Sequence, residues 1–245
     1  MSACILIPAR YESTRFPEKM LSPIQGIPMV VKVAKNMANF SQDVYVVTNH
    51  EKIQKACNEA QVNCLMVKDE VPNGSMRIWL AFERFLQDKD YDFLINVQGD
   101  EPLLDSRTVQ KLYEFHQATN FDITTLLKER VDHEQSNPNI VKCALAKNKS
   151  QCLYFSRATI PFNRESEETT TWYHHIGVYC YKKSALKKFV QLEESPLEKS
   201  EKLEQLRALE NGLTIGASLI EQKQELIGVD TPEDLEKVNR LLQTN

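Results

Sequence analysis

The sequence predicts an α/β fold built around a mostly parallel sheet. Short β-rich runs alternate with amphipathic helical stretches through the first half of the chain, which is the pattern of βαβ units. The run at residues 3–8 is continuously apolar, as is typical of a strand covered on both faces, and 92–97 is a further buried strand. The chain has 245 residues, 42% hydrophobic and 26% charged, which excludes a disordered, collagen-like or coiled-coil protein.

The elements follow one another in a regular order. Residue patterns predict strands at 3–8, 43–48, 63–67 and 92–97, with helices at 28–40, 51–60 and 75–86 between them. Three further strands, at 141–146, 152–156 and 172–181, have little helix between them and predict an antiparallel or mixed segment. The chain closes with a helix at 197–210, a strand at 213–220 and a helix at 231–242. We therefore expect a single domain over residues 1–245 with a small β-rich insertion at about 140–181.

Charge and hydropathy exclude several classes of partner. The 30 basic and 34 acidic residues give a net charge of −4 without a strongly basic block, so no nucleic-acid footprint is visible. No run approaches the roughly 20 apolar residues that cross a bilayer, and the N-terminal apolar run is too short for a signal-peptide core. The six scattered cysteines lack metal-binding spacing and favour free thiols in a reducing compartment. We expect a cytoplasmic protein that binds neither nucleic acid nor membrane.

A basic loop follows the first strand run. Arg10, Arg15 and Lys19 lie within ten residues, and the hydroxyl-bearing Ser13 and Thr14 lie between them. Several cations and hydroxyl donors at the end of a strand are what a triphosphate requires, and the arginine fork can bind phosphate oxygens at two points. The loop contains no glycine, so it is neither a Walker A nor a dinucleotide motif. A solvated basic loop is the alternative interpretation.

Two aspartates are candidate metal ligands. Asp100 lies just past the carboxyl end of the predicted strand 92–97, beside Gly99, which permits a tight turn and close backbone approach. Asp230 precedes a helix start in which Thr231 can serve as the N-cap, so Asp230 remains available to a ligand. Mg²⁺ prefers a few carboxylates completed by phosphates and water. Turn or capping roles are the alternative.

Six blocks of sequence resemble a known family. In order they are IPARYESTRFPEKML, VQGDEPL, YFSRATIPF, HIGVYCY, PLEKSEKLEQLRALENG and VDTPEDL. Together they resemble the 3-deoxy-manno-octulosonate (KDO) cytidylyltransferases over nearly the whole chain. The resemblance implies a Rossmann-like nucleotide-diphospho-sugar transferase fold that uses CTP and Mg²⁺ to make CMP-KDO and pyrophosphate for lipopolysaccharide biosynthesis. It also implies a homodimer, to which we expect the β-rich insertion to contribute.

The resemblance further implies roles for individual residues. The implied catalytic residues are Arg10, Arg15, Lys19, Asp100 and Asp230, with Asp100 and Asp230 holding the metal. The implied nucleotide contacts are Pro8, Ala9, Arg10, Ser13, Arg15, Lys19, Gly74, Ser75 and Arg77. The implied sugar-acid contacts are Gln98, Arg157, His175, Tyr179, Glu204 and Gln205. Taken alone, His175 is also consistent with a structural histidine, Arg157 with a surface cation and Glu204 with a solvated helix face.

The chain departs from the family pattern at residues 73–77. The family has Ser-Gly-Thr-Asp-Arg there, whereas Met76 replaces the acid in this chain and Trp79 follows where a smaller residue is typical. The loss of a carboxylate beside Arg77 keeps two alternatives open. One is activation of a related acid, such as 8-amino-KDO or a nonulosonic acid, and the other is a non-catalytic nucleotide-binding relative. The intact Asp100 and Asp230 argue against the second alternative.

Overall fold

The computed structural model describes residues 2–13, 16–164, 170–221 and 223–243, which divide into two compact units. The first unit comprises Met1–Gln110 and Glu225–Asn245, and the second comprises Lys111–Gln224. Helix α4 (Ser106–Gln117) carries the chain from the first unit into the second. The segment 140–181, expected as an insertion, belongs to the second unit. Each unit combines helices with a sheet, in agreement with the predicted α/β class.

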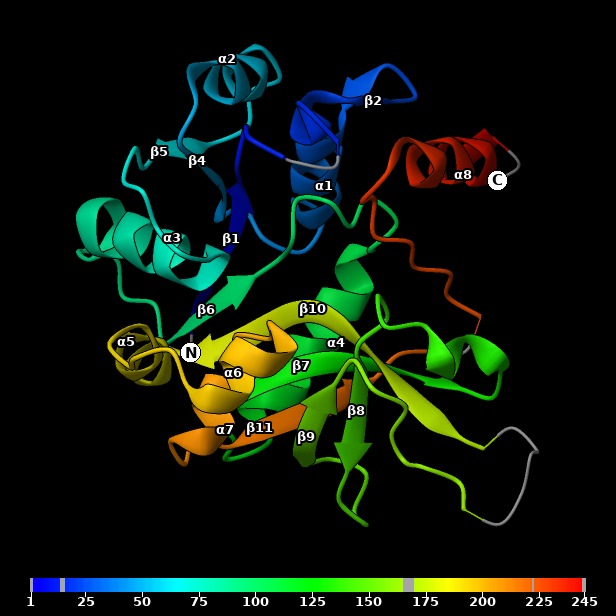
Figure 1. Ribbon diagram of the computed structural model, residues 1–245. Coiled ribbons are helices and arrows are strands. Elements are labelled where there is room, and N and C mark those ends of the chain that lie inside the picture. The colour runs from blue at the N-terminus through cyan, green and yellow to red at the C-terminus, as the bar shows by residue number, and fades with distance from the viewer. Residues whose placement is uncertain (1, 14–15, 165–169, 222, 244–245) are drawn as a thin grey trace. The chain divides into compact units, whose positions relative to one another are not determined.

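The first unit is built on four parallel strands in the order β6-β1-β4-β5 (Figure 1). They are β1 (Ala3–Ala9), β4 (Val44–Thr48), β5 (Cys64–Met66) and β6 (Phe93–Asn96). The chain runs outward from β1 to β4 and β5 and then returns to the other side of β1 as β6. Ligands of such sheets bind beyond the carboxyl ends of the strands, at the point where the strand order reverses. The loops that follow β1 and β6 therefore flank the expected binding crevice.

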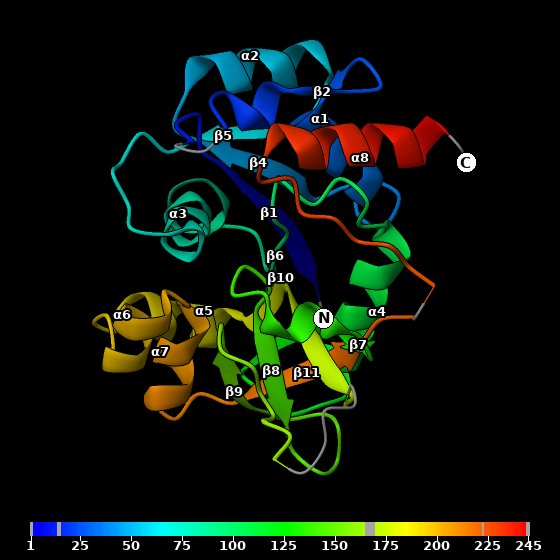
Figure 2. The same ribbon diagram turned by 45° about the vertical axis from the view of Figure 1, so that its right-hand side comes forward.

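Helices connect these strands where the apolar spacing predicts them. They are α1 (Met29–Met37), α2 (Glu51–Glu59) and α3 (Gly74–Ala81), and α3 continues into a π-helical turn, η2 (Phe82–Leu86). A 3-10 turn, η1 (Lys19–Leu21), and a small hairpin of β2 (Pro23–Ile24) and β3 (Ile27–Pro28) precede α1. The last helix, α8 (Pro232–Gln243), lies beside β2 in Figures 1 and 2. The backbone N–H of Gln25 donates to Asn239 Oδ1 at 3.0 Å and joins the two ends of the chain within this unit.

The second unit holds a mixed sheet. Strand β7 (Ile123–Arg130) pairs in parallel with β11 (Ile215–Leu219) and antiparallel with β10 (Trp172–Lys182). Strand β8 (Lys142–Leu145) pairs antiparallel with both β10 and β9 (Cys152–Ser156), as the spacing of these runs predicts. The helices are α5 (Lys183–Val190), α6 (Pro196–Glu201) and α7 (Gln205–Glu210), and η3 (His133–Ser136) is a 3-10 turn.

Two features of the second unit differ from the sequence prediction. The single helix predicted at 197–210 is two helices, because Lys202 adopts a left-handed φ of 53° after α6 and turns the chain before α7 begins. Elements α4, β7 and α5 were not predicted at all. Within the described part of the chain, no helix combines the length and apolar character needed to span a membrane.

Candidate active site

A pocket of about 800 Å³ opens in the first unit beyond the carboxyl ends of β1 and β6. Its walls come from the loop after β1, the start of α3, the loop after β6 and Asp230, two residues before α8. Among the residues singled out in the sequence, those that line it are Pro8, Arg10, Ser13, Lys19, Gly74, Arg77, Gln98, Asp100 and Asp230. Ala9 and Ser75 are fully buried and are not part of the lining. Arg15 lies outside the described residues.

Two glycines allow the walls of this pocket to approach one another. A Cβ atom at Gly99 would lie 3.0 Å from Met20 Sδ and 3.3 Å from the Pro8 carbonyl oxygen. A Cβ atom at Gly74 would lie 3.2 Å from Pro8 Cγ. Because these distances are shorter than ordinary van der Waals contacts, a side chain at either glycine would have to displace Pro8 or the Met20 side chain. The close backbone approach predicted at Gly99 is therefore confirmed.

Three charged side chains meet on one side of the pocket. Lys19 Nζ donates to Asp100 Oδ2 at 2.7 Å and to Asp230 Oδ1 at 3.1 Å. Burial by itself would lower the pKa of the Lys19 ammonium, but the charges of Asp100 and then Asp230 outweigh burial and raise it. Lys19 is predicted from the sequence to bind phosphates, and the two aspartates to bind a metal. The structure places all three side chains in direct contact.

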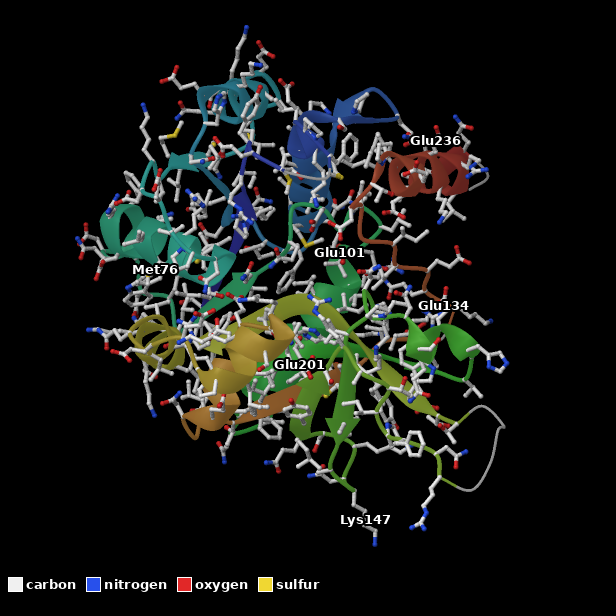
Figure 3. All side chains as sticks on the ribbon, viewed as in Figure 1. Met76, Glu101, Glu134, Lys147, Glu201 and Glu236 are labelled. Carbon is white, nitrogen blue, oxygen red and sulfur yellow. The ribbon has the colours of Figure 1, made fainter. Side chains whose placement is uncertain are left out.

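Glu101, which the sequence analysis missed, adds a carboxyl group beside this cluster (Figure 3). Its Oε2 atom is buried without a hydrogen-bond partner among the described residues. Burial raises the pKa of Glu101 to about 8, Asp100 and Asp230 add to that shift, and Lys19 opposes it. Burial at this position therefore favours the uncharged form of Glu101.

The loop after β1 is held against α2 by contacts that were not predicted. The Tyr11 ring stacks on His50 with centroids 3.7 Å apart and an interplanar angle of 8°. Lys52 Nζ donates to the Tyr11 hydroxyl at 2.6 Å and to Glu18 Oε1 at 3.0 Å, and the Tyr11 hydroxyl also bonds Glu18. Glu18 adopts a left-handed φ of 54°, which is costly for a residue with a Cβ. These contacts hold the turn that leads into Lys19.

Helix α3 begins at the pocket despite the departure at Met76. Asn73 caps the helix, since its Oδ1 accepts from the Met76 backbone N–H at 2.9 Å. Arg77 is 2% exposed, and its Nη1 donates to the Val67 carbonyl at 2.7 Å. Burial, followed by the charge of Arg10, lowers the pKa of Arg77. Met76 itself (Figure 3) is not among the residues that line the pocket.

His175 and Tyr179, two of the residues proposed to contact the sugar acid, lie together in the second unit. Their ring centroids are 5.5 Å apart on β10, which bulges against β7 between Ile176 and Tyr179. His175 Nε2 is 3.0 Å from Thr125 Oγ1, and that hydroxyl is 2.8 Å from the Val178 carbonyl oxygen. Because the hydroxyl has one proton, it donates to the carbonyl and accepts from Nε2–H, which assigns the tautomer. Burial lowers the pKa of His175 to about 3, so the imidazole is neutral.

Glu204 and Gln205 lie at the start of α7, also in the second unit. Gln205 is 5% exposed, and its Nε2 is buried without a hydrogen-bond partner in the described part of the chain. An unsatisfied buried donor costs about 1–3 kcal/mol. An oxygen acceptor of a bound ligand would remove that cost.

Arg157, at the end of β9, is held by bonds to main-chain and side-chain oxygens. Its backbone N–H donates to Glu201 Oε2 at 2.9 Å. Its Nε donates to the Glu201 carbonyl at 2.8 Å, and its Nη1 donates to the Pro138 carbonyl at 3.0 Å. A guanidinium has five N–H donors, and two of those of Arg157 are engaged by described residues, which leaves three for a carboxylate. Glu201, labelled in Figure 3 on α6, was not predicted to take part.

Comparison with known proteins gives consistent matches. The family model described as Cytidylyltransferase matches residues 4–215. The 3-deoxy-manno-octulosonate cytidylyltransferase of Bartonella bacilliformis is 41% identical over 243 residues, 97% of each chain, and that of Parabacteroides distasonis is 39% identical over 242 residues, 95% of this chain and 94% of the other. A structure of CMP:2-keto-3-deoxy-manno-octonic acid synthetase complexed with CTP matches with a TM-score of 0.91 at 31% identity, covering 100% of this chain and 99% of that one.

Proposed function

This chain belongs to the cytidylyltransferase family, and we propose that it transfers CMP from CTP to KDO and releases pyrophosphate. The Rossmann-like nucleotidyltransferase fold predicted from the sequence is confirmed by the match to a CTP-bound relative. The observation in the chain itself that carries the proposal is the pocket in which Lys19, Asp100 and Asp230 converge. The product, CMP-KDO, is the activated sugar for lipopolysaccharide biosynthesis.

The reaction requires positioning and charge neutralisation. The anomeric hydroxyl oxygen of the sugar acid attacks the α-phosphorus of CTP, and the bond from that phosphorus to the bridging oxygen of the β-phosphate breaks. Such transfers need no protein nucleophile. Arg10 and Lys19 line the pocket and supply positive charge to the β- and γ-phosphates. Arg15 is proposed to share this role.

Asp100 and Asp230 are the residues proposed to hold Mg²⁺. Their fit to a cation is supported by the Lys19 ammonium, which both carboxylates contact within 3.1 Å. Carboxylate oxygens are the protein ligands Mg²⁺ prefers, usually one or two of them with phosphates and water. The described residues contain no cluster of three or more acidic, histidine or cysteine side chains that could hold a metal, so the substrate would supply the remaining ligands. When bound, the metal lowers the pKa of the attacking hydroxyl and stabilises charge on the phosphate oxygens.

The sugar acid is proposed to contact Gln98, Arg157, His175, Tyr179, Glu204 and Gln205. Within the described part of the chain, three N–H donors of the Arg157 guanidinium and Nε2 of Gln205 have no partner, which supports this assignment. The neutral His175 adds no charge of its own, so Arg157 is the cation that balances the substrate carboxylate.

Pyrophosphate release from CTP, measured with KDO, 8-amino-KDO and a nonulosonic acid, tests this function. We expect the highest kcat/KM with KDO and no turnover in an Asp100→Asn variant that retains the wild-type circular dichroism spectrum. Turnover confined to another acid would reassign the substrate. Retained CTP binding without turnover of any acid would identify a non-catalytic relative.

A further inference from the structure

Lys142 is a fully buried lysine at the centre of the β-rich segment. Its side chain is 0% exposed, and it stands on β8 opposite Ser156 of β9 and His174 of β10. Buried lysines are rare and normally pair with a carboxylate, because an unpaired charge is costly to remove from water. The acceptors of the Lys142 ammonium are backbone carbonyls and not a carboxylate.

The Lys142 ammonium binds three backbone carbonyls. Nζ donates to the carbonyl oxygens of Asn137 at 3.0 Å and Ile140 at 2.9 Å, and it also donates to that of Arg157. Three acceptors match the three N–H donors of an ammonium group. Lys142 therefore ties the segment that precedes β8 to the end of β9.

The segment bonded to Lys142 also contacts the guanidinium of Arg157. The segment that Lys142 holds through Asn137 and Ile140 includes Pro138, whose carbonyl accepts from Arg157 Nη1 at 3.0 Å. Lys142 thus fixes the carbonyl of Arg157 directly and one acceptor of its guanidinium indirectly.

Glu201 holds Arg157 from the other side. Its carboxylate accepts from the Ser156 hydroxyl at 2.6 Å and from the Arg157 backbone N–H at 2.9 Å. Its backbone carbonyl accepts from Arg157 Nε at 2.8 Å. The main chain of Arg157 is therefore bonded at both its N–H and its carbonyl, and its guanidinium is bonded at two nitrogens.

We propose that Lys142 and Glu201 are positioning residues for the reaction proposed above, and that they act through Arg157 by aiming its guanidinium at the carboxylate of the sugar acid. The inference rests on the sugar-binding role proposed above for Arg157. A long arginine side chain loses several rotatable bonds of freedom when it binds, and holding it in advance lowers that entropic cost. The effect of Lys142 and Glu201 should therefore appear in the binding of the sugar acid and not in that of CTP.

The first test is steady-state kinetics of Lys142→Met, which keeps the apolar stem and removes the ammonium. We expect the KM for KDO to rise at least about tenfold, corresponding to about 1.4 kcal/mol, while the KM for CTP changes less than about twofold. Lys147→Met is the matched control, because Lys147 is an exposed lysine on the loop that follows β8 (Figure 3). A KM for KDO equal to that of the control, or equal rises in both KM values, overturns the proposal.

A double-mutant cycle tests whether Lys142 acts through Arg157. Residues that act through one group show non-additive effects. Arg157→Lys should itself raise the KM for KDO about tenfold, because lysine cannot reproduce the planar fork. Adding Lys142→Met to Arg157→Lys should then raise it less than about threefold further. A full tenfold additional rise means that Lys142 acts elsewhere and overturns the proposal.

Glu201→Gln keeps the proposal testable if Lys142→Met does not fold. The substitution removes the negative charge and one of the two acceptor oxygens, so the charge-assisted bonds from Ser156 and from the Arg157 backbone N–H cannot both be kept. We expect a several-fold rise in the KM for KDO with that for CTP unchanged, and an unchanged KM for KDO contradicts the proposal. Failure of the proposed function itself is distinguishable, because the wild-type protein would then not turn over KDO.

Discussion

Lys19 stands between two carboxylates, and its charge compensates both of them. The Lys19 side chain is 10% exposed, whereas those of Asp100 and Asp230 are 27% and 50% exposed. Removing the ammonium would leave two negative charges facing each other across a partly desolvated gap. Charge-assisted hydrogen bonds of this kind contribute about 1.5–3 kcal/mol each to stability. Because Asp230 is half exposed, the bond from Lys19 to Asp230 contributes about 1.5 kcal/mol or less.

Lys19→Met is therefore expected to lower the free energy of unfolding by about 1–3 kcal/mol in EDTA. Mg²⁺ should then stabilise this variant more than the wild-type protein, because the carboxylates no longer have their own cation. Thermal unfolding of both proteins, with EDTA and with excess MgCl₂, measures the difference. An equal Mg²⁺ effect on the two melting temperatures would argue that the metal does not bind at this position.

At the scale of single residues, the sequence predicts functional side chains where charged residues follow a strand or precede a helix. Lys19, Asp100 and Asp230 lie at strand ends or a helix start, and the structure brings them together. Glu101 and Lys142 were missed because nothing local distinguishes them from ordinary surface charges. Their roles depend on burial and on partners distant in sequence, such as Arg157, which is 15 positions from Lys142.

At the scale of elements, continuous apolar runs predicted strands correctly because those strands are covered on both faces. Strand β7 was missed because its sequence, ITTLLKER, mixes apolar with polar residues. Thr124 and Thr125 are nevertheless fully buried, since their hydroxyls bond to His116 and His175. Hydropathy cannot reveal polar residues that are buried in pairs.

The break between α6 and α7 is a second element that spacing could not predict. Leucines continue at helical intervals through residues 203–209, whereas Lys202 leaves the helix with a φ of 53°. A left-handed residue after a helix is normally glycine, which adopts this conformation without a Cβ penalty. Lys202 is exposed, so its side chain adds little to offset that cost.

Lys202→Gly is accordingly expected to raise the free energy of unfolding by about 0.5–1 kcal/mol, the penalty of a Cβ at this φ reduced by the added freedom of the unfolded chain. Lys199→Gly, at an exposed position within α6, is the matched control and should lower the free energy by about 0.5–1 kcal/mol. Urea unfolding measures both changes. Destabilisation by both glycines would show that residue 202 is helical in solution.

At the scale of the whole molecule, the sequence indicated α/β alternation but not which segments form each compact unit. The first unit joins residues from both ends of the chain, for example through the 3.0 Å bond between Gln25 and Asn239, 214 positions apart. Local patterns carry no information about such pairings. The parallel sheet itself was predictable because each of its connections is a short βαβ unit.

We also expect the protein to form a homodimer to which residues 140–181 contribute. The expectation comes from the family resemblance, and Leu153 on β9, which is 56% exposed, is one apolar side chain that a partner could cover. Sedimentation equilibrium at micromolar concentration should give about twice the chain mass of 28.3 kDa. A single species of 28.3 kDa would rule out the dimer.

Acid should destabilise the folded protein through buried neutral histidines of the second unit. Burial is the main cause that lowers the pKa of His116 to about 4, of His174 to about 4 and of His175 to about 3. In the unfolded chain these imidazoles bind protons near pH 6.5, so between about pH 6.5 and 4 the unfolded state holds more protons than the folded state. Their stabilising contribution is complete above pH 6.5 and is lost as the pH falls.

The free energy of unfolding should consequently fall by up to about 1.4 kcal/mol per pH unit for each histidine below pH 6. His116→Gln isolates one of them. The variant loses the 2.9 Å bond to Thr124, which lowers the free energy of unfolding equally at every pH. Only the loss of the titrating imidazole changes how that free energy depends on pH. Urea unfolding at intervals from pH 7 to pH 5 measures how the free energy of unfolding changes with pH. This dependence should be weaker in His116→Gln, by the equivalent of about one proton. Parallel slopes for the two proteins would mean that His116 is protonated in the folded state, contrary to its burial between α4 and β7.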